Sequence, residues 1–190
     1  MDEAVREESA LREESALLVR CPAAEPAVGA WRARLDLAAG VGVPAHATVT
    51  YPFRPVEQLS GADHDRLGRL FADVPSFTLV GERTAWFGEE AVYVALTGGD
   101  RVSALIEAVT REFPEHPPYG GTIAHVIPHV TVGHDHDLAT LRSAAAAVDA
   151  RLPFRQPVTA VELWAGPPPA TGRGQWRRVR AYPLRQTSQT

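Results

Sequence analysis

Two segments of the sequence share the pattern His-x-Thr-Val, and each has the composition of a β-strand. The first is His46-Ala47-Thr48-Val49 and the second is His129-Val130-Thr131-Val132. β-branched residues favour extended backbone, and in a strand residues i and i+2 point to the same face. Each segment is therefore predicted to present one imidazole and one hydroxyl on one face, while apolar side chains anchor the opposite face.

The order of predicted elements around these segments repeats. Each half of the chain is predicted to run strand, helix, His-x-Thr strand, helix and then hairpin, which suggests two similar lobes facing each other. The helix over 63–72 is expected to begin with Asp63 as its N-cap. Strands are predicted at 15–20, 46–51, 77–80, 83–87, 92–97, within 123–132, 158–164 and 175–182, and helices at 27–37, 63–72, 102–113 and 138–152.

A cleft with two imidazoles and two hydroxyls suits a phosphodiester substrate. An unperturbed imidazole titrates near pH 6.5. One histidine can therefore take a proton from an attacking water or hydroxyl, while the other gives a proton to the leaving oxygen. Threonine hydroxyls can donate hydrogen bonds to the non-bridging phosphate oxygens. These donors can stabilise the developing negative charge without a metal, so we expect no metal and no cofactor.

With these residues the sequence resembles the 2H phosphoesterase superfamily. That family is named for two His-x-Ser/Thr motifs and includes 2′-5′ RNA ligase-like proteins and cyclic nucleotide phosphodiesterases. Residues 46–53 (HATVTYPF) resemble its first motif with the Tyr-Pro-Phe ending. Residues 128–132 (PHVTV) resemble its second motif with the preceding proline. The resemblance covers about residues 15–184.

The resemblance implies an α+β, bilobal fold. Each of two similar lobes would hold a mainly antiparallel sheet with flanking helices, and the active-site cleft would lie between them. It also implies hydrolysis or ligation at 2′,3′-cyclic phosphate or 2′-5′ phosphodiester linkages of nucleotides or RNA. His46 and His129 would be the acid–base pair, and Thr48 and Thr131 would hold the phosphate. Several family members carry a basic residue just after the second motif, where this chain has glycine followed by His134.

The charge balance limits the class of partner. The formal net charge is −4 with a pI near 6.0, and all 19 basic residues are Arg. A protein that grips long nucleic acid without sequence preference is normally basic. We therefore expect a small or locally contacted substrate, namely a nucleotide or RNA terminus with a cyclic phosphate or a 2′-5′ linkage. Phosphate contacts from basic side chains must come from Arg or His.

Length and composition favour one bilobal domain over 15–190, preceded by a charged extension over 1–14. A tandem repeat of Arg-Glu-Glu-Ser-Ala-Leu spans 6–17. The single cysteine, Cys21, excludes an internal disulfide and a cysteine metal cluster. No apolar run reaches the roughly 18 residues of a membrane span, and the charged N-terminus is unlike a signal peptide. We expect a cytoplasmic protein without membrane contact that acts as a monomer.

Aromatic and basic residues outside the motifs are candidates for substrate binding. Tyr51, Trp86 and Tyr119 could stack on a base beside the phosphate. Packing in the core is the alternative for Trp86. Arg178 belongs to the densest basic segment and could guide an anionic substrate, with a solvated strand face as the alternative.

Three other functions stay open on the residues alone. RNA end-joining through a 2′-5′ bond would use the same histidines in the reverse direction. A binding module would hold a nucleotide or phosphorylated metabolite without turning it over. A metal hydrolase would use the histidines and aspartates between His125 and Asp137, whose alternative is a polar loop after the strand.

Overall fold

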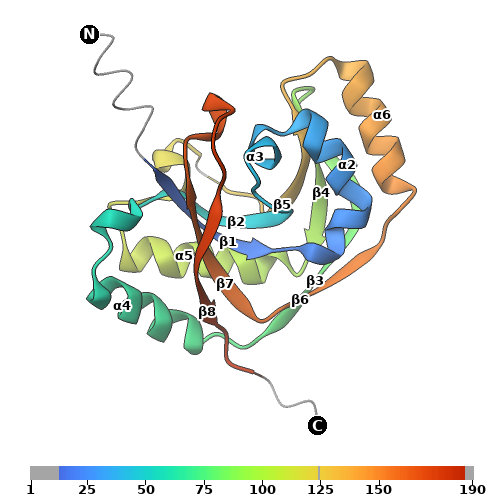
Figure 1. Cartoon of the computed structure of the whole chain (residues 1–190). Coiled ribbons are helices and arrows are strands. Elements are labelled where there is room, and N and C mark those ends of the chain that lie inside the picture. The colour runs from blue at the N-terminus through green and yellow to red at the C-terminus, as the bar shows by residue number, and fades with distance from the viewer. Residues whose placement is uncertain (1–12, 124, 187–190) are drawn as a thin grey trace, which may run out of the picture.

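Two four-stranded antiparallel sheets form the frame of the protein. The computed structural model describes residues 13–123 and 125–186 (Figure 1). The strand order is β2-β1-β7-β8 in the first sheet and β5-β4-β3-β6 in the second. The strands are β1 (Glu14–Arg20), β2 (His46–Phe53), β3 (Phe77–Phe87), β4 (Ala91–Thr97), β5 (His129–His134), β6 (Phe154–Val158), β7 (Ala160–Gly166) and β8 (Arg177–Pro183).

Each sheet is covered by two helices from different parts of the chain. Helices α4 and α5 lie against the first sheet, and α2 and α6 lie against the second (Figure 1). The helices are α2 (Glu25–Leu35), the short α3 (Leu37–Gly40), α4 (Gly61–Ala72), α5 (Gly99–Glu112) and α6 (Leu138–Asp149), and 3-10 turns occur at Pro22–Ala24 (η1), Val56–Gln58 (η2), Pro118–Gly121 (η3) and Pro169–Thr171 (η4). No helix within these described ranges has both the length and the apolar composition to cross a membrane.

The predicted α+β fold with two similar sheet-and-helix lobes is confirmed, but a lobe is not half of the chain. The first sheet takes strands from both ends of the chain, and the second takes the four strands between them. The helix after β1 packs on the second sheet, and the helix after β4 packs on the first. The two lobes are therefore interleaved. Element order along the sequence could not reveal this exchange, because it does not specify which sheet each helix covers.

Several predicted boundaries are wrong for identifiable reasons. The segments 77–80 and 83–87 form one strand, β3, because a bulge near Gly81 keeps the pairing continuous. Strand β2 continues through Pro52, which an edge strand tolerates. Strand β6 was not predicted. Helix α4 begins earlier, because Ser60 is the N-cap and Asp63 completes a capping box from the third helical position. Of the charged extension over 1–14, residues 1–12 lie outside the described residues.

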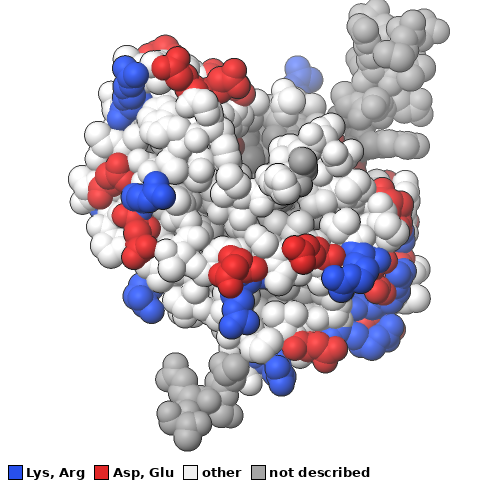
Figure 2. Space-filling view, turned by 180° about the vertical axis from the view of Figure 1, so that it is seen from behind, with Lys and Arg blue, Asp and Glu red and all other residues white. Residues whose placement is uncertain are grey.

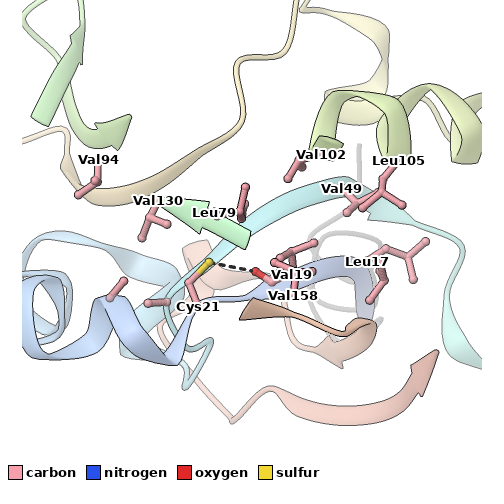
Figure 3. Packing of buried hydrophobic residues seen from close by; sticks show 14 of the residues in the cluster. Leu17, Val19, Cys21, Val49, Leu79, Val94, Val102, Leu105, Val130 and Val158 are labelled. Carbon is pink, nitrogen blue, oxygen red and sulfur yellow. Dashed lines mark hydrogen bonds between the residues drawn. The ribbon is translucent and has the colours of Figure 1, made fainter. Parts of the chain in front are cut away.

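One cluster of buried apolar side chains joins the two sheets. Leu17, Val19 and Val49 enter it from the first sheet, while Leu79 and Val130 enter it from the second (Figure 3). Full burial of a Val or Leu side chain stabilises the fold by about 1.5–3 kcal/mol. The sheets are therefore held together by the same side chains that anchor the motif strands from behind.

Leu79→Ala should destabilise the protein by about 2–5 kcal/mol, because it opens a cavity between the two sheets at a side chain with no exposed surface. Chemical denaturation followed by circular dichroism measures the change. Leu37→Ala is the matched control, because that leucine is 54% exposed and should cost well under about 1 kcal/mol. Equal losses in both variants would contradict a shared core at Leu79.

Candidate active site

The two motif strands are edge strands that lie against each other. Strand β2 ends the first sheet and β5 ends the second, and the two strands are in direct contact. In both strands the first histidine and the threonine two residues later are partly exposed. The apolar residues between and after them are buried, with no exposed surface at Ala47, Val49, Val130 and Val132. The predicted two-residue alternation is therefore confirmed in both strands.

A β-bulge follows the His-x-Thr segment in each strand. In β2 the pairing with β1 shifts between Leu17 and Leu18, and in β5 the pairing with β4 shifts between Val92 and Tyr93. A bulge inserts one residue and reverses the alternation of faces. In each strand the sixth residue, counted from the histidine, therefore lies on the same face as the histidine and the threonine. We call this face the motif face. The sixth residue is Tyr51 in β2 and His134 in β5, and both are partly exposed.

Both motif imidazoles are held in the same way. Nδ1 of His46 donates a hydrogen bond to the Pro44 carbonyl (2.7 Å), and Nδ1 of His129 donates to the Ile127 carbonyl (2.6 Å). A carbonyl oxygen can only accept, so the proton of the neutral ring sits on Nδ1. The Nε2 lone pair of each ring is therefore the one available to a substrate.

The surroundings keep both imidazoles neutral in the free protein. Burial, together with the nearby Arg32 charge, lowers the pKa of His46 to about 4, and the Pro44 carbonyl and Asp36 restore only part of the decrease. Burial also lowers the pKa of His129, although the Ile127 carbonyl and Asp36 favour its charged form. A charge on His129 would also disfavour a charge on His46, so the two rings are close enough to repel when both are protonated.

The motif face opens onto two adjoining cavities. His46, Thr48 and Tyr51 line a first-motif cavity together with Trp176. The second-motif cavity is larger, and its lining includes the matching three residues of β5: His129, Thr131 and His134. The same three positions of each strand therefore form part of the wall of a cavity.

Tyr119 joins the two halves of the site. Its side chain forms a hydrogen bond with that of Thr48 and also lines the second-motif cavity, and burial raises the pKa of its phenol. Its backbone has φ 53° and ψ 33°, in the left-handed region that costs a non-glycine residue energy. A hydrogen bond from the Thr50 hydroxyl to the His116 carbonyl (3.2 Å) ties its loop to β2. The strained conformation thus lies at the junction between the motifs.

A buried ionic network, which the sequence analysis did not identify, lies beside the histidines. The Arg32 guanidinium donates to the Asp36 carboxylate from Nη2 (2.8 Å) and Nε (3.0 Å). Nε2 of His134 lies 3.7 Å from Oδ1 of Asp36, and Nδ1 of His134 lies 2.6 Å from Oδ2 of Asp135. We call Arg32, Asp36 and His134 the ionic network. The spacing of Arg32 and Asp36, four residues apart on one helix face, was a visible signal for the first pair.

The network keeps Asp36 ionised and makes His134 a cation at neutral pH. Burial opposes ionisation of Asp36, but His134 and Arg32 outweigh it and lower the pKa of the carboxyl to about 2. The Asp36 carboxylate raises the pKa of His134 to about 9 against the effect of burial, and Asp135 adds to the increase. His134 is therefore a cation at neutral pH, whereas His46 and His129 are neutral.

The remaining predicted binding residues are placed differently. Tyr51 and Tyr119 line the cavities. Trp86 instead packs against the core, and its neighbour Phe87 lines the second-motif cavity, since successive residues of a strand face opposite sides. Arg178 lies in β8, at the opposite edge of the sheet from β2, and its Nη1 pairs with Oε1 of Glu162 at 3.3 Å.

The histidine-rich segment after the second motif does not assemble a metal site. Among residues 13–123 and 125–186, no three or more His, Cys, Asp or Glu side chains are placed to share a metal ion. His125 lines the second-motif cavity, and His136 lies on a separate surface hollow with Arg34. The geometry of these described residues therefore offers no support for the metal-hydrolase alternative.

Comparisons with known proteins agree with the motifs. The model of the 2′-5′ RNA ligase superfamily matches residues 20–166. No curated protein sequence matches the chain. Among solved structures, E. coli LigT complexed with 3′-AMP has a TM-score of 0.56 at 19% identity, and the similarity covers 90% of this chain and 98% of that one. TT0787 of Thermus thermophilus has a TM-score of 0.55 at 16% identity, with 91% and 98% covered. At these identities the similarity concerns the fold.

Asp36→Asn should lower the pKa of His134 from about 9 toward the ordinary imidazole value, because the carboxylate that favours the charged ring is lost. NMR signals of the histidine ring protons, followed from about pH 5 to about pH 10, would report the titration of His134. Asp135→Asn is the control and should produce a smaller decrease, since Asp135 is the weaker contributor. A His134 pKa that Asp36→Asn leaves unchanged would show that the network does not charge this ring.

Proposed function

Since the chain belongs to the 2′-5′ RNA ligase superfamily, we propose that it is a metal-independent phosphodiesterase acting on 2′,3′-cyclic phosphate or 2′-5′ phosphodiester linkages. The substrate would be a nucleotide or an RNA terminus. The observation that carries the proposal is the matched pair of imidazoles. Each donates its Nδ1 proton to the backbone carbonyl two residues earlier and has no hydrogen bond at Nε2 to the part of the chain that the structure describes, and the two strands lie together.

The different surroundings of the two imidazoles support an assignment of their roles. His46 would be the general base, because burial and Arg32 keep it unprotonated well below neutral pH. His129 would be the general acid, because Arg32, which disfavours a charge on His46, is not among the groups that lower the pKa of His129. A bound phosphodiester anion adds a negative charge that would further raise the pKa of His129.

In the proposed reaction, water attacks phosphorus and Nε2 of His46 takes its proton. The bond between phosphorus and the leaving oxygen breaks, and His129 gives its proton to that oxygen. The products are a phosphate monoester and a hydroxyl group, which remain in one molecule when the substrate is cyclic. Both protons are thus accounted for by the two rings, and a second proton transfer through solvent restores them.

Hydrogen-bond donors and one charge would stabilise the phosphorane-like transition state. The Thr48 and Thr131 hydroxyls line the cavities beside the histidines and can donate to the non-bridging oxygens. Tyr119, bonded to Thr48, would fix the direction of that hydroxyl. His134 would supply a positive charge from the motif face in a partly buried site.

Ligands of proteins with the same fold are consistent with a nucleotide or phosphate substrate. Structures of E. coli LigT are complexes with 3′-AMP, NADP+ and phosphate. The same arrangement of histidines could also join RNA ends through a 2′-5′ bond, since acid and base exchange roles in the reverse direction. A non-catalytic binding module would need neither free Nε2 atoms nor two imidazoles, so turnover separates it from both enzymatic alternatives.

The first test is the release of nucleoside monophosphate from 2′,3′-cyclic nucleotides in the presence of a chelator. His46→Ala and His129→Ala should each reduce the rate at least about a hundredfold, because each removes one proton-transfer group. His136→Ala is the control, since His136 lines neither motif cavity. Binding of nucleotide without turnover would favour the binding module, and loss of all activity with chelator would contradict the metal-independent mechanism.

The charge on His134 predicts a specific pH dependence of substrate binding. The raised pKa means that the ring is charged below about 9 and neutral above it. The KM for a cyclic nucleotide should therefore rise by about tenfold or more as pH increases through about 9, because the positive charge beside the phosphate is lost.

Two variants at this position test the cause of the increase. His134→Gln should have a high KM that does not vary with pH, and His134→Arg should keep the low KM at alkaline pH. kcat should change less than KM in both, because the phosphate is already anionic in the ground state and meets the His134 charge there as well as in the transition state. A wild-type KM that stays flat up to about pH 10 would show that this cation does not bind the phosphate.

A further inference from the structure

The carbonyl that holds His46 belongs to a peptide group that is itself held on its other side. Nδ1 of His46 donates to the Pro44 carbonyl at 2.7 Å. The N–H of the same peptide group is that of Ala45, and it donates to Oε1 of Glu25 at 2.6 Å. A peptide group is planar, so its carbonyl cannot turn without moving its N–H. The Glu25 carboxylate therefore fixes the direction of the acceptor that holds the His46 proton.

The segment before His46 is held from both ends of α2. Glu25 is the first residue of this helix, and Arg32 lies in its last turn. Nη1 of Arg32 donates to the Val43 carbonyl at 3.2 Å. Pro44 lies between the two points of attachment and has no N–H that needs a partner. One helix therefore binds the backbone on either side of the residue that accepts the His46 proton.

The charged side chains that make these two contacts are turned inward. On the face seen in Figure 2, Arg, Asp and Glu side chains lie next to each other at the surface, which is the ordinary place for them. The Arg32 side chain is instead 2% exposed, and Glu25 is partly buried. Burial of a charge costs free energy unless hydrogen bonds compensate for it. Each of the two has such a partner in the backbone just before His46.

Helix α2 also leaves space for the Glu25 carboxylate. Gly29 lies one turn after Glu25, and a Cβ added at Gly29 would come within 2.8 Å of Oε2 of Glu25. Glycine inside a helix is unfavourable relative to alanine. The carboxylate beside it therefore accounts for a glycine at this position of the helix.

The second motif cannot contain the same arrangement. The peptide group whose carbonyl holds His129 joins Ile127 to Pro128, and proline has no N–H to donate to a carboxylate. The corresponding position before His46 is Ala45, whose N–H is bound to Glu25. The additional support is therefore specific to one histidine, the one whose Nε2 is proposed to take a proton from water.

We propose that Glu25 is a positioning residue for His46. Its carboxylate holds the peptide group between Pro44 and Ala45, and this group keeps the His46 proton on Nδ1 and the lone pair on Nε2, where a substrate meets it. The inference rests on the proposed function for the role of His46 as general base. It adds a residue that lies outside both motifs and outside the lining of both motif cavities.

Steady-state kinetics on a 2′,3′-cyclic nucleotide test this role. Glu25→Ala should lower kcat by about tenfold to a hundredfold, because a misplaced general base slows the chemical step. KM should change much less, since the groups proposed to bind the phosphate stay in place. Glu25→Gln keeps an acceptor oxygen and should restore most of the rate. Wild-type kcat in Glu25→Ala, or a Glu25→Gln enzyme as slow as Glu25→Ala, would overturn the proposal.

Two further variants separate positioning from stability. Oδ1 of Asp149 accepts from the Thr84 N–H at 2.7 Å, so Asp149→Ala also removes a carboxylate that holds a backbone amide, away from both motif cavities. It should lower Tm and leave kcat unchanged. In Gly29→Ala the new Cβ displaces the Glu25 carboxylate while alanine favours the helix, so kcat should fall without a lower Tm. A kcat that simply follows Tm across these variants would overturn the proposal.

The protonation site of His46 tests the proposal without turnover. NMR chemical shifts of the two ring nitrogens should place the proton on Nδ1 in the wild type, in Glu25→Gln and in Asp149→Ala. Glu25→Ala should give a mixture of both tautomers, because the Pro44 carbonyl is no longer held. If the wild type turns over no cyclic phosphate, the proposed function fails and this measurement alone decides the inference. A His46 tautomer that Glu25→Ala leaves unchanged would overturn it.

Discussion

The structure depends on burial of one face of two edge strands. Ala47 and Val49 behind the first motif, and Val130 and Val132 behind the second, have no exposed surface and belong to one cluster that joins the sheets. A shift of either strand by one residue would bring a histidine and a threonine into that core, at a cost of several kcal/mol for unpaired polar groups. The packing that fuses the two lobes therefore also fixes the register of the reactive side chains.

The same frame carries different chemistry in its two halves. Both strands have a His-x-Thr segment, a bulge and a third residue on the motif face, but that residue is Tyr51 in one and His134 in the other. The hydroxyl of Tyr51 is bound to Glu14, whereas His134 is paired with Asp36. The pseudo-symmetry thus supplies two equivalent imidazoles, and the asymmetric neighbours give them different proton affinities.

The motif geometry could be predicted from the sequence, while its surroundings could not. Two-residue alternation is a local property, so the facing of His46 with Thr48 and of His129 with Thr131 followed from their positions alone. The bulge that returns His134 to the motif face depends on pairing with another strand. Gly133 within the segment is a local signal for a bulge, but it does not specify which side chain returns to that face. For Trp86 the sequence left stacking on a base and core packing open, and the structure places it against the core while Phe87 lines the cavity, because the face of a strand that meets the cavity is set by the whole sheet.

The absence of lysine gives the ionic network its importance. Every basic residue is Arg, and Arg177 and Arg178 of the densest segment pair with Glu13 and Glu162. The charge on the motif face comes instead from a histidine whose pKa depends on a carboxylate. An arginine at that position would stay charged at every accessible pH. His134, by contrast, is charged only while the Asp36 carboxylate stays beside it, and Asp36 is held by its buried ion pair with Arg32. Packing of α2 against β5 is therefore coupled to the proposed binding of phosphate, which would link the stability of one lobe to the chemistry between both.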